Sequence, residues 1–350
     1  MILIDFSHLA MRNLFTSVYN AKPKKKDGKF ITEQFIGMFF HQMLNSLDKI
    51  KNKFDYKDEK EIILALDGRG NWRKDVSKYY KGTRKEGRDK SDINFEEYYE
   101  YLNEFIDELK NTFGYKSLQV DKTEADDIIF VLGEKFKDRV TAISSDKDFK
   151  IILKYGCKLY DPIKDLYVNM TEDEIDNWLK IHIMVGDKAD NVFHIKWNTE
   201  FTSEFHKHLR LNDFLGNELD FFYLSLEEQS KYIDSFDVWY INKKGEPIEK
   251  KIYKKVRFGE KTAEKLIPKL NEYFSKENRE KDYRRQLEFE NFILNKKLVH
   301  PSGIPEDIKE KIIESYNIEE GKINKVNENK FYKKYNLRER MNRNKTAFYF

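Results

Sequence analysis

Short runs of apolar residues alternate with longer amphipathic stretches in the first half of the chain. The apolar runs are "MILI", "EIILAL", "SLQV" and "RVTAIS", and the amphipathic stretches cover 32–50, 95–112 and 124–136. Buried strands of a parallel sheet have the first pattern, and surface helices have the second. The alternation therefore predicts an α/β fold with a mostly parallel central sheet that is flanked by helices.

The strand pattern fades after about residue 190. The remainder predicts helices at 205–216, 226–235, 262–275, 280–296 and 306–316. The segment "GEPIEKKIYKKVRF" (245–258) predicts a linker or a hairpin, because a glycine and a proline precede alternating basic and apolar residues. We accordingly expect an α/β domain at 1–193 and a smaller, mainly helical domain at 194–350.

Composition limits the class of protein. Of 350 residues, 36% are charged and 15% are aromatic, and mean hydropathy is -0.79, which indicates a globular chain with a charged surface rather than a disordered one. The single Cys157 excludes an internal disulfide and a cysteine zinc cluster. No apolar run approaches the roughly 20 residues that cross a bilayer. We expect a monomer in the cytoplasm, or in the host cytoplasm for a phage protein.

Carboxylates follow three of the predicted strands. Asp5 follows "MILI", Asp67 follows "EIILAL", and Asp146 and Asp148 follow "RVTAIS". The carboxyl ends of parallel strands meet at one edge of a sheet, so these side chains should lie close together. Two further clusters supply more acids: Glu124, Asp126 and Asp127 in "EADD", and Asp187 and Asp190 in "GDKADN".

Glu124 and Asp127 should share one face of the helix that "EADD" opens, and Asp187 and Asp190 should do the same if their segment is helical. Each cluster alone is also typical of a helix start, where acids complement the helix dipole. Together, so many carboxylates would repel one another and require a cation. Oxygen ligands without cysteine or histidine favour Mg²⁺ or Mn²⁺, and separate strand ends suit two ions. Two such ions activate a water and stabilise the leaving oxygen of a phosphodiester.

A basic segment follows Asp67. From 73 to 90, eight basic residues stand against three acidic ones, beside the aromatic residues Trp72, Tyr79 and Tyr80. A charged run is commonly a solvated face. Beside a metal site, however, basic side chains bind phosphates and aromatic rings stack on unpaired bases. We therefore predict a basic arch at about 73–95 that binds nucleic acid.

The order of these motifs resembles the metal-dependent 5' nucleases, which include flap endonucleases and the 5' exonuclease domain of bacterial DNA polymerase I. The resemblance rests on "LIDFS", "ALDGRGNWRKDVSKYYKGTR", "EADD", "SSDKDF", "GDKADN" and "FGEKTAEKLI", and the T-even phage type of ribonuclease H is the most similar branch. It implies a PIN-like nuclease core. It also implies a structure-selective 5'-3' exonuclease and flap endonuclease that removes RNA primers and DNA 5' ends in lagging-strand replication or repair.

The resemblance also implies a role for each acidic residue. One Mg²⁺, replaceable by Mn²⁺, is expected around Asp5, Asp67, Asp126 and Asp146. A second ion is expected around Asp148, Asp187 and Asp190, while Glu124 and Asp127 complete the acidic pocket. Asp146 and Asp148 stand two apart at the end of a strand, so Asp146 is expected to reach one ion and Asp148 the other.

Basic and glycine residues complete the implied site. Lys81 and Arg84 would steer and polarise the scissile phosphate, and Tyr80 would stack on a base near it. Arg73 and Lys85 would contact phosphates. A helix-turn-helix-like motif near 256–275 would present backbone N–H groups to a duplex phosphate, through Gly259, Lys261 and Thr262. About 60 residues separate this turn from "GDKADN", a longer interval than in most relatives.

Partners follow from the same resemblance: DNA and RNA/DNA duplexes with 5' ends or flaps, a sliding clamp and a single-strand binding protein. The tail "NRNKTAFYF" either tucks onto the body or docks on the clamp. A non-catalytic nucleic-acid binding protein with the same fold is the alternative, but none of the expected acidic positions is lost. Preference for RNA primers or DNA flaps stays open, because recognition of a 2'-hydroxyl leaves no motif.

Overall fold

The computed structural model describes residues 1–54, 62–216, 220–221, 224–236, 239–241, 243–245, 247–337 and 340–341. The tail "NRNKTAFYF" (342–350) therefore lies outside the described residues. Contacts divide the chain into a first unit, Met1–Lys78 with Gly82–Glu172 and Ile304–Phe350, and a second unit, Tyr79–Lys81 with Asp173–Gly303. The domain boundary that we placed near 193 remains a prediction; the contacts change unit after Glu172 and return to the first unit at Ile304.

The first unit is built on a six-stranded sheet. Its strands, in spatial order, are β5 (Lys116–Gln119), β4 (Ile62–Leu66), β1 (Ile2–Asp5), β6 (Thr141–Ile143), β7 (Lys158–Asp161) and β8 (Leu166–Val168). All neighbours are parallel except β7 and β8. The mostly parallel central sheet expected from the apolar runs is confirmed.

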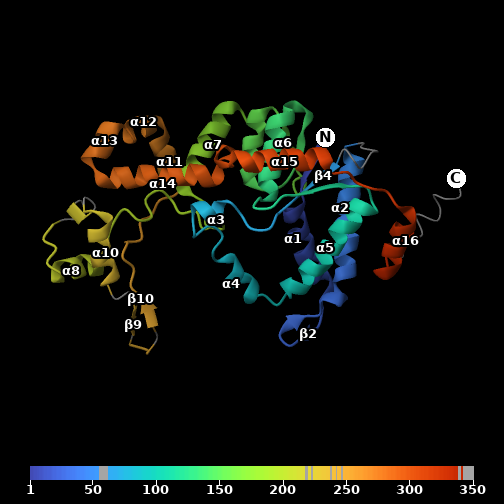
Figure 1. The fold of residues 1–350 in the computed structure, drawn as a ribbon, viewed down its shortest axis with the longest axis horizontal. Coiled ribbons are helices and arrows are strands. Elements are labelled where there is room, and N and C mark those ends of the chain that lie inside the picture. The colour runs from blue at the N-terminus through green and yellow to red at the C-terminus, as the bar shows by residue number, and fades with distance from the viewer. Residues whose placement is uncertain are drawn as a thin grey trace. The chain divides into compact units, whose positions relative to one another are not determined.

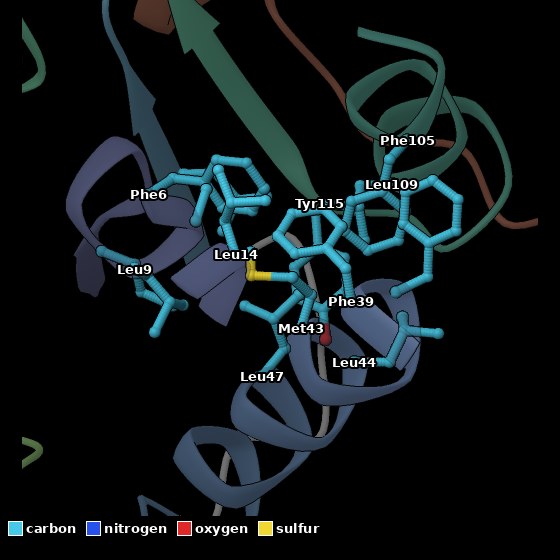
Figure 2. Packing of buried hydrophobic residues seen from close by; sticks show 14 of the residues in the cluster. Phe6, Leu9, Leu14, Phe39, Met43, Leu44, Leu47, Phe105, Leu109 and Tyr115 are labelled. Carbon is cyan, nitrogen blue, oxygen red and sulfur yellow. The ribbon is translucent and has the colours of Figure 1, made fainter. Parts of the chain in front are cut away.

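Helices cover both faces of this sheet because its central strands are buried on both sides. Every residue of β1 and β4 is buried. Alternate residues of these strands join the core formed by α1 (Phe6–Ala21), α2 (Ile36–Lys53) and α5 (Phe95–Asn111). Figure 2 shows the side chains of these three helices converging. On the other face lie α6 (Ala125–Phe136) and, packed on it, α15 (Glu306–Ile318) (Figure 1).

Short elements complete the first unit. They are the hairpin β2 (Lys25–Lys26) and β3 (Lys29–Phe30), the helices α3 (Arg73–Val76), α4 (Arg84–Asp89) and α16 (Lys325–Lys334), and the 3-10 helices η1 (Thr32–Gln34), η3 (Lys137–Arg139) and η4 (Lys147–Tyr155). In the part of the chain that the structure describes, no helix has both the length and the apolar character needed to cross a membrane.

The second unit is mainly helical, as predicted. Its elements are α7 (Glu172–Val185), α8 (Ser203–Leu211), α10 (Leu226–Asp234), β9 (Trp239–Ile241), β10 (Pro247–Glu249), α11 (Glu260–Leu266), η5 (Ile267–Lys269), α12 (Leu270–Tyr273), α13 (Lys276–Lys281), α14 (Tyr283–Val299) and η6 (Pro301–Gly303). The sequence predicted one helix at 262–275, whereas Pro268 lies in the 3-10 turn η5 between α11 and α12. The segment 245–258, predicted as a linker or a hairpin, contributes only β10 to a hairpin; β10 pairs with β9, which precedes that segment, and Gly245 between them has a φ of 81°.

Candidate functional site

The first group of predicted site residues lies at the carboxyl edge of the sheet. Asp5 ends β1, and β1 lies between β4 and β6. The chain leaves β1 toward β4 but leaves β6 toward β7, so the connections diverge on either side of the carboxyl ends of β1 and β6. In open α/β sheets, a crevice that binds ligands forms at such a point. Asp67, which follows β4, and Asp146, which follows β6, border it.

Asp5 is buried and its carboxylate is fixed by two donors. Oδ1 accepts the backbone N–H of His8 at 3.0 Å, which caps α1, and Oδ2 accepts the hydroxyl of Ser144 at 3.1 Å. Burial raises the pKa of Asp5 to about 6, and the nearby charge of Asp67 adds to the increase, while the two donors oppose it. The buried carboxylate is thus held in one orientation at an energetic cost.

Asp67 connects the end of β4 to the start of α6. Its Oδ1 accepts the backbone N–H of Ala125 at 2.9 Å, which brings the neighbouring Asp126 to the same edge. The chain can turn there because Gly68 has no side chain: a Cβ would lie 1.7 Å from the carbonyl oxygen of Val120. Glycine in "ALDG" is therefore required by this close approach.

Asp146 and Asp148 are joined by a local hydrogen bond. Asp146 caps η4, and its Oδ1 accepts the N–H of Asp148 at 3.0 Å. The N–H of Asp146 donates to Ser144 Oγ at 3.1 Å, so one serine hydroxyl contacts both Asp5 and the Asp146 backbone. Burial, followed by the charge of Asp148, raises the pKa of Asp146.

This set of side chains fits divalent cations. The first unit brings Asp5, Asp67, Asp126, Asp146 and Asp148 to one sheet edge, and all of them offer oxygen ligands. Burial is the main cause of the raised pKa of Asp5 and of Asp146, and the nearby charges of Asp67 and Asp148, respectively, add to it. A divalent cation relieves that repulsion, and oxygen donors are the ligands that Mg²⁺ and Mn²⁺ prefer.

Asp127 is engaged differently from the other acids. It is fully buried, and Arg73 donates to both of its oxygens, from Nη2 to Oδ1 at 2.7 Å and from Nη1 to Oδ2 at 3.0 Å. Its Oδ2 also accepts the indole N–H of Trp72 at 3.2 Å and the N–H of Glu124 at 2.9 Å. Three of these donors reach Oδ2 and one reaches Oδ1, so the charge of this buried carboxylate is compensated within the protein.

Three expectations are corrected by this network. Asp127 directs its carboxylate to the guanidinium of Arg73 rather than to the open edge of the sheet, and forms a capping box with Glu124 at the start of α6. Arg73 is only 4% exposed, so its guanidinium does not face a solvent-borne phosphate. Trp72, one of the aromatic residues expected to stack on bases, is buried as well. The count of charges places Arg73 in the basic arch. In the structure, Arg73 instead anchors the start of that segment to α6.

Arg73→Met is expected to lower the free energy of unfolding by about 3 to 5 kcal/mol, because it leaves the buried Asp127 without its partner. Asp127→Asn should cost less, because Arg73 Nη1 still lies 3.2 Å from Glu124 Oε2. The double variant Arg73→Met/Asp127→Asn should lose clearly less than the sum of the two. Urea unfolding with Mg²⁺ and with EDTA measures this, with Arg88→Met on exposed α4 as the control. An Asp127→Asn effect that appears only with Mg²⁺ would instead make Asp127 a metal ligand.

Asp187 and Asp190 belong to the second unit and lie on a turn. Helix α7 ends at Val185, and Gly186 adopts a φ of 74°, where a Cβ would lie 2.3 Å from the carbonyl oxygen of Val192. Asp187 Oδ1 accepts the N–H of Ala189 at 2.8 Å. The expectation that the two acids share a helix face is therefore corrected: their spacing of three residues belongs to a turn.

Tyr80 and Lys81 contact the same turn. Tyr80 donates its hydroxyl to Asp190 Oδ2 at 3.0 Å, and the ammonium of Lys81 lies 3.5 Å from that oxygen. The N–H of Lys81 donates to the Asp190 carbonyl at 2.8 Å. Tyr80 is only 4% exposed, so its ring is not available to stack on a base, contrary to expectation. The neighbouring ring of Tyr79 is 47% exposed.

The remaining predicted contacts with nucleic acid lie on the surface. Arg84 and Lys85 begin α4, in which every residue is exposed. Gly259 caps α11 with extended backbone and open space around it, and Lys261 and Thr262 are exposed in the first turn. These positions can reach a ligand from solution.

Two buried asparagines that the sequence did not single out hold the turn of Asp187 and Asp190. Asn295, on α14, donates to the carbonyl oxygens of Ile183 and Phe193 at 2.8 and 2.7 Å. Asn291 donates to the carbonyl oxygen of Ile195 at 2.7 Å. The sequence marks these residues only as two asparagines spaced by four within an amphipathic helix. It does not reveal their partners, which lie about 100 residues away.

Comparison with known proteins supports the resemblance of this chain to the 5' nucleases. A family model described as the 5'-3' exonuclease, N-terminal resolvase-like domain, matches residues 1–180. The chain is 35% identical to ribonuclease H of Enterobacteria phage T4 over 210 residues, which cover 57% of this chain and 64% of that protein. It is 24% identical to a 5'-3' exonuclease of Buchnera aphidicola subsp. Schizaphis graminum over 203 residues, 55% of this chain and 63% of that protein.

These alignments span slightly less than two thirds of the length of either relative. Among solved structures, T5 5'-exonuclease with bound divalent metal ions (zinc) is similar with a TM-score of 0.52 and 14% identity. That match covers 90% of this chain and 97% of the T5 chain. The similarity shows a shared fold, and the fold class predicted from the apolar runs and the resemblance is confirmed.

Proposed function

The chain belongs to the 5'-3' exonuclease family, and on this premise we propose that it is a structure-selective 5'-3' exonuclease and flap endonuclease. Its substrates are RNA primers and DNA 5' ends in duplexes, in lagging-strand replication or repair. One observation carries the proposal: Asp5, Asp67 and Asp146 converge where the connections of a parallel sheet diverge. Carboxylates gathered at such a crevice are suited to metal-dependent phosphodiester hydrolysis.

Two divalent ions, Mg²⁺ or Mn²⁺, are the proposed cofactors. Asp5, Asp67, Asp126 and Asp146 would hold one ion, with Glu124 beside them. Asp148, Asp187 and Asp190 would hold the other. When bound, such ions activate a water and stabilise the leaving oxygen of the phosphodiester. Asp127 is left out of the ligand set, because Arg73 occupies its carboxylate.

The basic residues bind and orient the substrate in this proposal. Lys81, held beside Asp190, donates to the scissile phosphate, while Arg84 and Lys85 on the exposed α4 bind neighbouring phosphates. Gly259, Lys261 and Thr262 contact the backbone of the duplex. A sliding clamp and a single-strand binding protein are the proposed protein partners, and the residues of the tail lie outside the described part of the chain.

The test is cleavage of a 5'-labelled flap and of a 5' RNA-primed duplex, each with Mg²⁺ and with EDTA. We expect cleavage with Mg²⁺ and none with EDTA. The lengths of the labelled products should show that the cuts lie near the 5' end. Asp146→Asn should abolish cleavage and retain binding. A wild-type protein that binds both substrates and cleaves neither would favour a non-catalytic binding protein.

A further inference from the structure

Three aromatic rings of the second unit lie against one another beside the turn of Asp187 and Asp190. Phe193 and Trp197 stack with ring centroids 4.5 Å apart and an interplanar angle of 24°. The ring of Tyr79 stands edge-on to both, at 5.8 Å from Phe193 and 6.1 Å from Trp197. We call Tyr79, Phe193 and Trp197 the aromatic cluster.

Two rings of the aromatic cluster are exposed, and the third, Trp197, is half-buried. Tyr79 is 47% exposed and Phe193 is 38% exposed, whereas the adjacent Tyr80 and Ile195 are buried. Tyr79 and Phe193 therefore present apolar surface to solvent. Exposed aromatic side chains that contact one another are characteristic of binding surfaces.

The backbone under the aromatic cluster is fixed. The Phe193 carbonyl accepts from Asn295, and Ile195, between Phe193 and Trp197, donates its N–H to Met184 and accepts from Asn291. Rings on a fixed backbone lose little further conformational entropy when they bind a ligand. The cluster is thus organised before any ligand arrives.

The neighbours of the aromatic cluster indicate which ligand it fits. Lys81 follows Tyr79 by two residues, and its N–H and ammonium both contact Asp190, three residues before Phe193. The rings therefore adjoin the residues that, under the proposed function, hold the phosphate to be cleaved. A flat, apolar ligand tied to a phosphate is a nucleotide, and aromatic side chains stack on unpaired bases of any sequence.

We propose that the aromatic cluster binds an unpaired nucleobase of the substrate, next to the phosphate at which cleavage occurs. This inference rests on the proposed function and adds to it a subsite for a base. Tyr79, rather than the buried Tyr80, takes part in stacking, together with two rings that lie outside the basic segment. Because the contact is with the face of a base, it should be independent of sequence and sugar type.

Binding to a 5'-flap duplex tests the proposal in the Asp146→Asn background, where cleavage does not interfere. Tyr79→Ala, Phe193→Ala and Trp197→Ala should each weaken binding by roughly 10-fold. The substrates are the intact flap and a series that carries a single abasic nucleotide at successive positions around the junction. At one position, the abasic substrate should bind the parent protein more weakly and reduce the effect of each ring substitution to less than about 2-fold.

Leu211→Ala is the control, because Leu211 is an exposed apolar residue of the second unit outside the cluster, and it should leave binding unchanged. Thermal melts check that each variant folds. 2-Aminopurine at the sensitive position should lose fluorescence on binding to the parent and not to Trp197→Ala. Losses of equal size on every abasic substrate would overturn the proposal and leave the rings a structural role. The proposed function fails separately, if the wild-type protein does not cleave.

Discussion

Asp5→Asn is expected to abolish cleavage and, at the same time, to stabilise the metal-free protein. Asparagine has the shape of aspartate, so its oxygen still accepts from His8 and its amide donates to Ser144 Oγ. The substitution removes a negative ligand from the proposed metal site, where the ions contribute several kcal/mol to the transition state. We therefore expect cleavage to fall by at least about 100-fold.

The stability of the metal-free protein should move in the opposite direction. Burial raises the pKa of Asp5 from 3.8 to about 6, so its ionised form is disfavoured in the folded protein. A group with a raised folded pKa contributes stability below its unfolded pKa and loses that contribution as pH rises through the folded pKa. The wild-type protein in EDTA should therefore lose up to about 3 kcal/mol from this group between about pH 4 and pH 6.

Thermal melts in EDTA at pH 7.5 and at pH 4 measure this difference. At pH 7.5, Asp5→Asn should melt about 6 to 12 °C above the wild type, and at pH 4 the two should melt together. Asp107→Asn, an exposed position on α5, should change neither cleavage nor melting. Mg²⁺ should stabilise the wild type more than Asp5→Asn. If Asp5→Asn instead melts below the wild type at pH 7.5, the ionised Asp5 carboxylate is stabilised by a cationic side chain of the protein, and the prediction is wrong.

The elements of the fold were predictable because burial on both faces leaves a clear mark in the sequence. Strands β1 and β4 are buried at every position, and so appear as the continuous apolar runs "MILI" and "EIILAL". The order of the strands was not predictable in the same way. It depends on which parallel neighbours each strand meets, and an apolar run does not specify its neighbours.

The grouping of the acids at the strand ends was predictable, because the topology of a parallel sheet alone brings them together. The role of each basic and aromatic residue was not, because it depends on tertiary contacts. Arg73 and Arg84 are equal in a count of charges, yet one is buried against Asp127, 54 residues away, and the other begins an exposed helix. Tyr79 and Tyr80 are adjacent and chemically identical, yet Tyr80 is buried and donates its hydroxyl to Asp190, whereas Tyr79 is 47% exposed. Burial of long polar side chains is decided by tertiary partners.

Lys81→Ala is expected to lower the rate of cleavage by roughly 100-fold while changing substrate affinity by less than about 3-fold. The side chain of Lys81 is 15% exposed, so its ammonium is partly removed from water, where its interaction with a phosphate is stronger. Under the proposed function, other cations, such as those of the exposed α4, would provide most of the affinity for phosphates. One donor aimed at the charge that develops during the reaction affects rate more than binding.

The backbone at position 81 makes alanine a clean substitution. Lys81 has a φ of 52°, and its N–H donates to the Asp190 carbonyl. Alanine meets the same conformational cost there as lysine and keeps this hydrogen bond, so the position of the turn should persist. Single-turnover rates at saturating enzyme, with affinities measured separately in the Asp146→Asn background, distinguish the two effects. Lys74→Ala, an exposed cation of the same basic segment, is the matched control and should alter the rate by less than about 3-fold.

Lys81→Arg should recover only part of the rate, because a guanidinium presents its donors in a planar fork and does not reproduce a compact ammonium. Tyr80→Phe offers an independent check. It removes the neutral hydroxyl that donates to Asp190 Oδ2 and leaves the ammonium of Lys81, 3.5 Å from that oxygen, in place. If Lys81→Ala weakened binding by as much as it slowed cleavage, Lys81 would be one more phosphate contact of the basic segment and Asp190 its structural partner.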